Sequence, residues 1–113
     1  MIRVLITLSP RIYREAVAFS LESRPDIEAR AAPPEEAELE LAGFRPHLLV
    51  HNDAEGLGPE ATAAGVLCYV EIPYSDGINA RMTAGQTVSV LRDISIEDLL
   101  RMVNVTATVG GLQ

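Results

Sequence analysis

The sequence predicts an α/β domain built on a doubly wound, five-stranded parallel sheet. Apolar, β-branched runs of strand length alternate with segments of helical periodicity along the chain. Strand–helix–strand units of this length form right-handed crossovers, which bring parallel strands together and place helices on both faces of the sheet. A chain of 113 residues with 48% apolar content can bury one core of this kind but not two. We therefore expect one domain over residues 1–109, with residues 110–113 beginning a linker.

The first strand and helix are predicted from a sharp change of pattern. Residues 2–8 form a mostly apolar, β-branched run that is typical of a strand buried on both faces. Ser9 is expected to cap the following helix, which begins at Pro10, runs to about Ser23 and is ended by Pro25. The apolar stripe of this helix is predicted to contain Ile12, Ala16, Phe19 and Ser20.

Two more strands and a second helix follow in the first half of the chain. Residues 26–31 alternate in polarity and predict a short strand near one edge of the sheet. Residues 33–36 carry two prolines and two acids, which favour a helix start, and Gly43 is expected to end that helix. Residues 47–51 form the third predicted strand.

The second half supplies two further strands and the last helix. Residues 66–70 and 87–91 are the fourth and fifth predicted strands, and the last helix is expected from Ile96 to about Asn104. Residues 103–109 alternate strictly, as a strand would, so their state is left open between helix and strand. The third crossover is short and holds at most a turn or two of helix at residues 59–64.

Composition excludes several classes of function. The nine basic residues are all arginine and the net charge is −7, so no basic stripe is available to bind nucleic acid. No apolar run approaches the ~20 residues of a membrane span, and the N-terminus resembles no export signal, which predicts a cytoplasmic protein. Cys68 is the only cysteine, so an internal disulfide is impossible. His47 and His51 would lie about 13 Å apart along a strand, too far to share a metal.

Three segments of the chain resemble one protein family. MIRVLITLSPRIYREAVAFSLESRPDIEAR at the start, RPHLLVHND in the middle and AGQTVSVLRDISIEDLL near the end resemble the receiver domain of bacterial response regulators. These segments look most like the subfamily whose receiver domain precedes a LuxR-type helix-turn-helix domain. The resemblance implies a flavodoxin-like strand order of 2-1-3-4-5, homodimer formation and a DNA-binding domain beyond the linker.

The resemblance also implies a phosphorylation site, and this sequence departs from it at every position. Receivers have two metal-binding acids after the first strand, a phosphoacceptor aspartate at the end of the third, a hydroxyl after the fourth and a lysine after the fifth. The corresponding residues here are Leu8, Ser9, Asn52, Val70 and Arg92. Phosphoryl transfer needs a cation held by oxygen ligands and a nucleophile, so we predict no catalytic residue, metal or cofactor, and no enzyme activity. Asp53 is the remaining candidate acceptor, although one step along a strand reverses a side chain's direction.

Three functions are compatible with these features. The first is a phosphorylation-independent regulatory and dimerisation domain of a transcriptional regulator. Its dimer face is predicted to include Arg81, Arg92, Asp93, Ile94, Asp98, Leu99, Arg101 and Met102. The second is a sensor that binds a pathway metabolite in the vestigial pocket of Leu8, Ser9, Asn52, Val70 and Arg92, unless these side chains simply fill that pocket. The third is a phosphoacceptor acting through Asp53.

Overall fold

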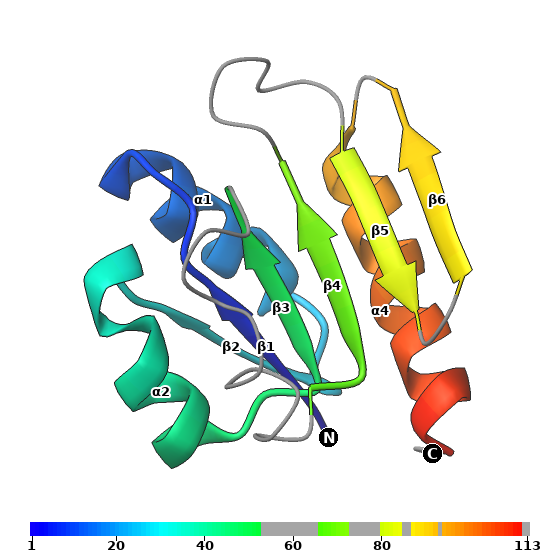
Figure 1. Cartoon of the computed structure of the whole chain (residues 1–113), viewed down its shortest axis with the longest axis horizontal. Helices are drawn as coiled ribbons and strands as arrows, with labels where there is room; N and C mark the ends of the chain where they lie inside the picture. Colours follow the sequence, from blue (N-terminus) through cyan, green and yellow to red (C-terminus); the bar gives the residue numbers. More distant parts are fainter. Residues whose placement is uncertain (53–65, 73–79, 85–86, 93, 112–113) are drawn as a thin grey trace.

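The computed structural model describes residues 1–52, 66–72, 80–84, 87–92 and 94–111. In this part of the chain, six strands form one sheet in the order β2-β1-β3-β4-β5-β6 (Figure 1). The strands are β1 (Ile2–Ile6), β2 (Ile27–Ala31), β3 (Leu48–His51), β4 (Cys68–Glu71), β5 (Ala80–Ala84) and β6 (Thr87–Leu91). The helices are α1 (Arg11–Leu21), the 3-10 turn η1 (Pro34–Glu36), α2 (Ala37–Phe44) and α4 (Ile96–Gly110).

The mixed α/β class is confirmed, and the first four strands have the predicted order. β1 pairs in parallel with β2 on one side and β3 on the other, and β3 pairs in parallel with β4. The chain thus starts at the centre of the sheet, moves outward to β2 and returns past β1 to β3. This reversal places α1 and α2 on opposite faces (Figure 1).

The prediction of five parallel strands is wrong for the second half of the sheet. The strand predicted at residues 87–91 is the sixth, because residues 80–84 form an unpredicted strand between it and β4. β5 is antiparallel to both β4 and β6. Two residues separate β5 from β6 and eight separate β4 from β5, whereas a parallel crossover needs about a dozen. The short connections therefore impose a hairpin.

The sheet divides the core into two unequal parts. On the face covered by α1 and α4, the larger cluster gathers fully buried side chains such as Val4, Val50, Val70 and Val103. On the face covered by α2, the smaller cluster contains Leu5, Ala32, Leu41, Phe44, Leu49 and Val66. Most of the burial that stabilises the fold therefore lies between the sheet and the α1–α4 layer.

Helix α1 differs from its prediction in both its start and its buried face. Pro10 is the N-cap residue and no side chain caps the helix, so Ser9 does not have the capping role expected of it. Val17, Ala18 and Leu21 face the core. The predicted stripe points outward instead, with Ile12 77% and Phe19 81% exposed. The sequence of α1 has apolar residues on two opposite sides, and periodicity alone does not say which side the sheet covers.

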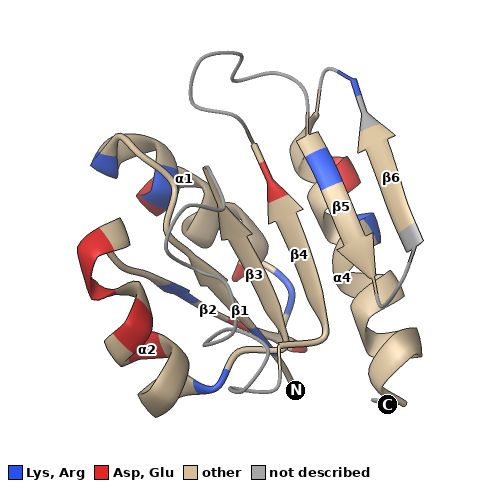
Figure 2. Cartoon of the chain, in the orientation of Figure 1, with Lys and Arg blue, Asp and Glu red and all other residues tan. Residues whose placement is uncertain are grey.

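The second helix forms almost where the sequence places it. Its two prolines and two acids form η1, which leads directly into α2. The helix continues through Gly43 and ends at Phe44, and its C-cap residue Arg45 adopts a left-handed conformation with φ 54°. The charged residues of η1 and α2 are all acidic (Figure 2). Arg30 of β2 reaches it with an ion pair to Glu40 at 2.9 Å.

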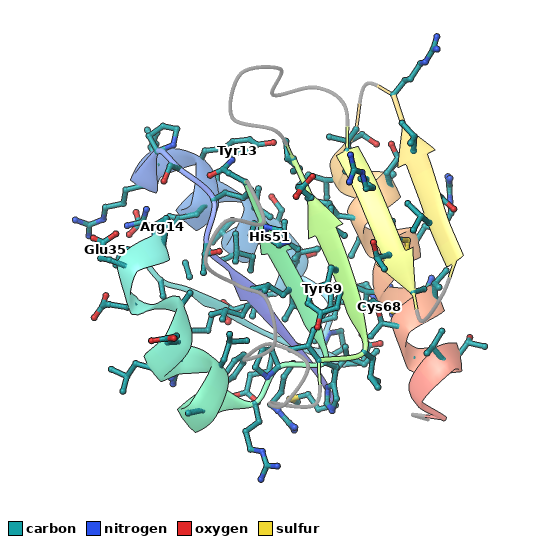
Figure 3. The ribbon with its side chains drawn as sticks, in the orientation of Figure 1. Tyr13, Arg14, Glu35, His51, Cys68 and Tyr69 are labelled. Atoms are coloured by element: carbon teal, nitrogen blue, oxygen red, sulfur yellow. The ribbon has the colours of Figure 1, made fainter. Side chains whose placement is uncertain are left out.

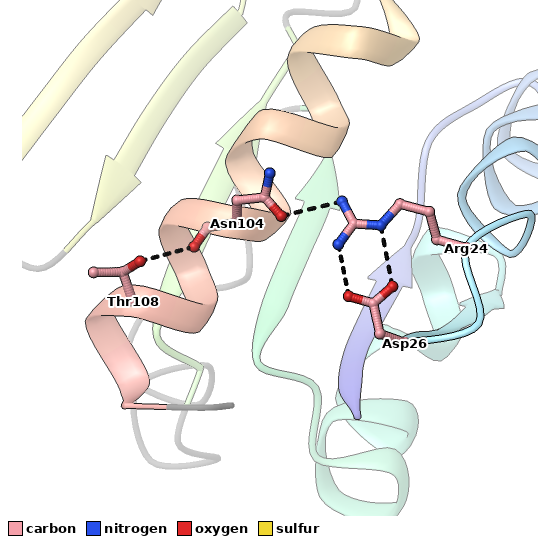
Figure 4. Close-up of polar contacts among 4 residues, drawn as sticks. All are labelled: Arg24, Asp26, Asn104 and Thr108. Atoms are coloured by element: carbon pink, nitrogen blue, oxygen red, sulfur yellow. Dashed lines mark hydrogen bonds and ion pairs between the residues drawn. The ribbon is translucent and has the colours of Figure 1, made fainter.

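Residues 103–109, for which the sequence allowed either helix or strand, are helical. Helix α4 continues through them to Gly110. Ser95 and Asp98 form a capping box at its start. The alternating threonines are accommodated because the Thr106 and Thr108 hydroxyls donate to the carbonyls four residues earlier, at 2.8 and 3.1 Å. Arg24, in the loop between α1 and β2, binds both Asp26 and Asn104 and so ties this loop to α4 (Figure 4).

Three predicted features lie outside the described residues. They are the short helix at 59–64, the candidate acceptor Asp53 and the predicted dimer residue Asp93. No helix among the described residues is both long enough and apolar enough to cross a bilayer.

Candidate functional site

The candidate site lies at the carboxyl edge of β1, β3 and β4. The strand order reverses between β1 and β3, and ligands of open α/β sheets bind outside the carboxyl ends of strands at such a reversal. Ser9 follows β1, Asn52 follows β3 and Ile72 follows β4. The parallel pairing therefore brings together three segments that are far apart in the sequence.

Asn52 links the ends of β1 and β4. Its Oδ1 accepts a hydrogen bond from the Ser9 backbone N–H at 2.7 Å. Its Nδ2 donates to the Ile72 carbonyl oxygen at 3.2 Å. An amide can do both, whereas an ionised carboxylate can only accept. The asparagine is therefore matched to its two backbone partners in a way that an ionised aspartate would not be.

Leu8 and Val70 fill the space beneath this link. Both have 0% relative exposure and belong to the larger core cluster. The Leu8 carbonyl oxygen accepts a hydrogen bond from Arg14 Nη1 at 3.4 Å. Ser9 and Asn52 are partly buried. This edge of the sheet therefore has apolar packing and one amide.

Arg92 is separated from the other four residues of the predicted pocket. It follows β6 and is exposed. β4 and β5 lie between β6 and β3, so Arg92 starts three strand spacings, or about 14 Å, from the strand that carries Asn52. The structure thus brings together Leu8, Ser9, Asn52 and Val70 and leaves Arg92 at the far edge of the sheet. The inserted strand β5 is the cause.

Two buried polar residues near this edge were missed by the sequence analysis. Thr7 is 2% exposed, and its N–H donates to the Val50 carbonyl oxygen at 2.8 Å. His51 ends β3, is 4% exposed and lies in register with Glu71 of β4. Figure 3 labels His51 within the sheet, with Tyr13 and Arg14 in the first turns of α1. A polar residue that ends an apolar strand was the available signal for His51.

His47 lies at the opposite edge of the sheet and has a structural role. Its Nδ1 accepts a hydrogen bond from the Arg3 backbone N–H at 3.0 Å, which fixes the entry of β3 beside β1. Partial burial lowers the pKa of His47, and the positive charges of Arg3 and the N-terminus lower it further. Among the described residues, no group of three or more His, Cys, Asp and Glu side chains could hold a metal ion.

Cys68 is a buried core residue in β4 (Figure 3). Burial raises the pKa of its thiol, and a hydrogen bond with Thr106 opposes this shift. Reactive cysteines have a lowered pKa and are at least partly accessible. Cys68 therefore lacks the properties of a nucleophile.

The predicted dimer face requires correction. Leu99 and Met102 are 3% and 2% exposed and pack in the main core, because they belong to the stripe of α4 that faces the sheet. Ile94 is partly buried against the same core. Arg81 lies 3.9 Å from Glu71, and Arg101 lies 3.4 Å from Asp98, so these charges have partners within the chain.

Comparison of the chain with protein-family models, with curated proteins and with solved structures gave no match. Function is therefore inferred from the residues and their geometry.

Proposed function

We propose that this chain is a phosphorylation-independent, receiver-like regulatory domain of a cytoplasmic bacterial transcriptional regulator, and that it acts by self-association. The proposal combines the sequence resemblance with the parallel strand order β2-β1-β3-β4. The net charge of −7 means that contact with DNA would require another domain.

The observation that carries the proposal is the bonding of Asn52. This residue stands at the position of the phosphoacceptor in the resemblance, at the carboxyl end of β3. Both ends of its amide are engaged, one with Ser9 and one with Ile72. The position serves to hold three strand ends together, and an amide nitrogen is not a nucleophile for phosphorus.

The surroundings of Asn52 support the same conclusion. Phosphoryl transfer depends on a cation and other positive groups that neutralise the charge of the transferring group. Leu8 and Ser9 provide no carboxylate for a cation. Arg92, the counterpart of the receiver lysine, is held at the far edge of the sheet. These three differences remove the nucleophile, the metal site and the charged partner together.

The metabolite-sensor alternative has less support. A ligand pocket needs wall residues with accessible surface. Leu8 and Val70 have none, since both are 0% exposed. Packing of the vacated pocket by the chain's own side chains explains these substitutions without a ligand. Phosphorylation of Asp53 stays a separate hypothesis, because that residue lies outside the described part.

The test is sedimentation equilibrium over a wide concentration range, with and without a small-molecule phosphoryl donor and Mg²⁺. We expect a reversible dimer whose dissociation constant is the same in both conditions, and no gain of one phosphoryl mass by mass spectrometry. A monomer at all concentrations would refute self-association. A mass gain that is abolished by Asp53→Asn would refute phosphorylation independence.

A further inference from the structure

The outward side of α1 carries an exposed apolar stripe. Ile12 is 77% exposed, Phe19 is 81% exposed and Ala16 between them is also exposed. These residues are four and three positions apart, so they lie in line along one side of the helix. The core-facing residues of the same helix, such as Val17 and Leu21, lie on the opposite side.

This stripe differs from an ordinary scatter of exposed apolar residues. Single exposed hydrophobes are common on soluble proteins and need no explanation. Here a large aliphatic side chain and one of the two phenylalanines of the chain are both turned fully outward, whereas the other, Phe44, is 8% exposed. A small residue between two large ones at this spacing suits helix-on-helix packing, because the small residue lets two helices approach closely.

The two flanks of the stripe differ in charge. One flank carries Arg11 at the start of α1, then Glu15, and Glu22 at its C-cap. Arg11 and Glu15 form an exposed ion pair at 2.9 Å. The other flank carries Tyr13 and Ser20, which are uncharged. Figure 2 shows that α1 bears both signs of charge, whereas the charged residues of η1 and α2 are all acidic.

We propose that two copies of this chain pair through α1, with the two helices antiparallel across a two-fold axis near Ala16. The proposal rests on the self-association proposed above and names its surface. In this arrangement Ile12 of each copy packs against Phe19 of the other, and Ala16 meets its own counterpart at the crossing.

The charge pattern favours a second copy of the chain as the partner and an antiparallel arrangement of the two helices. In an antiparallel pair, each flank of one helix meets the same flank of the other, in reverse order. Arg11 of one copy then lies beside Glu22 of the second copy, and Tyr13 lies beside Ser20. In a parallel pair, the charged flank of each helix would instead meet the uncharged flank of the other, so Arg11 would have no acid opposite it. The N-terminus of each helix also lies near the C-terminus of the other, which favours opposite helix dipoles.

The size of the surface predicts a weak dimer. A helix of 11 residues is about 16 Å long, so one such pair lies at the low end of interface areas. Dissociation should therefore occur within an accessible concentration range. A regulatory domain with such an interface responds to its own concentration.

The strand β6 offers the main competing surface. It ends the described sheet, and its Val88 and Val90 are 57% and 71% exposed. Pairing of two β6 strands would continue the sheet between copies. This surface gives a control variant of the same chemistry on a different part of the molecule.

The first experiment compares three proteins by sedimentation equilibrium: the unchanged chain, Ile12→Ala/Phe19→Ala and Val88→Ala/Val90→Ala. We expect the α1 variant to raise the dissociation constant at least tenfold and the β6 variant to change it less than twofold. Thermal unfolding of each variant verifies that it folds, which the exposure of all four side chains favours. A dimer that is lost in the β6 variant and kept in the α1 variant would overturn this inference and leave self-association intact. A monomeric unchanged chain would refute the proposed function itself.

The second experiment tests the antiparallel direction by charge exchange. Arg11→Glu and Glu22→Arg each place like charges at both ends of the interface, so each variant alone should dimerise severalfold more weakly than the unchanged chain. Mixed together, they restore both opposite-charge pairs, so native mass spectrometry should show the mixed dimer in excess of both homodimers. Arg92→Glu, after β6, and Glu38→Arg, on α2 at the opposite face of the sheet, carry the same charge changes outside α1 and correct for net charge. If the α1 pair mixes no more selectively than this control pair, the antiparallel contact is wrong.

Discussion

At the scale of single residues, one amide joins the ends of three strands. Asn52 has the shape of aspartate but uses one end as an acceptor and the other as a donor, to the backbones of Ser9 and Ile72. Both partners are fixed by the parallel pairing of β1, β3 and β4. The residue therefore acts as a structural link at the position where the resemblance implies a phosphoacceptor.

We predict that Asn52→Asp is destabilising at neutral pH. The new carboxylate can still accept from Ser9, but it faces the Ile72 carbonyl oxygen without a proton to donate, which should cost about 1–3 kcal/mol in the free energy of unfolding. Acidification should reduce this cost, because a protonated carboxyl can donate again. Urea denaturation at pH 7 and pH 5 measures both effects. Equal stability of the two proteins at pH 7 would mean that the link to Ile72 contributes nothing.

His47 predicts a pH dependence of stability. Its pKa in the folded protein is below the ordinary value of 6.5, because burial and nearby positive charge disfavour the imidazolium. Between the folded and the unfolded pKa, the unfolded chain binds more protons than the folded chain. The contribution of His47 to the free energy of unfolding is therefore fully present above about pH 6.5 and decreases as the pH falls below that value. His47→Gln should lose this part of the pH dependence and about 1 kcal/mol at pH 7.5. Denaturant titrations of both proteins from pH 7.5 to 5.5 test this, and identical slopes would contradict it.

The burial of Cys68 predicts that its thiol is protected from reagents in the folded protein. It is 0% exposed, and burial raises its pKa, so a thiol reagent should modify it only when the protein opens. We expect labelling at neutral pH to be at least a hundredfold slower than for the chain unfolded in urea. Rapid labelling in the native state would show that β4 or α4 opens locally.

At the scale of elements, connection length and two-sided periodicity explain the differences from prediction. β5 runs antiparallel to β6 because the two-residue connection between them permits only a hairpin. Helix α1 carries apolar side chains on both sides, and the sheet covers only one of them. Helix α4 extends to Gly110 because its threonines bond to their own helix and its stripe, Leu99, Met102, Val103 and Thr106, is buried.

Helix α2 gives a prediction at this scale. Gly43 lies within the helix, and a Cβ added there meets no atom within 4 Å. Gly43→Ala should therefore raise the free energy of unfolding by about 0.5–1 kcal/mol, because alanine loses less backbone entropy in a helix. Gly111→Ala is the matched control. It has equal space but a φ of 66°, so the same substitution there should not stabilise. Equal gains at both sites would contradict the explanation.

At the scale of the whole molecule, the acidic charge opposes self-association. Each copy carries a net charge of −7 within extents of 34 × 28 × 27 Å. At low salt this repulsion extends across the molecule, whereas at physiological salt the screening length is about 8 Å. The exposed contacts between Arg11 and Glu22 contribute little in comparison.

We therefore predict that salt strengthens the dimer. Raising the ionic strength from about 0.01 to 0.15 M should lower the dissociation constant on the order of tenfold. Sedimentation equilibrium at the two salt concentrations measures it. Weaker association at the higher salt would mean that attraction between opposite charges, rather than apolar contact, holds the copies together.

The sequence by itself determined the α/β class and the approximate positions of most strands and helices. These features depend on local periodicity and turn residues, which are readable along the chain. Only the tertiary structure decided that Asn52 joins Ser9 to Ile72, that Arg92 lies apart from them and that Ile12 and Phe19 face solvent. Each of these depends on which segments the sheet brings together. A two-sided helix or a five-residue strand contains no local information about its neighbours, so burial across the whole fold makes the choice.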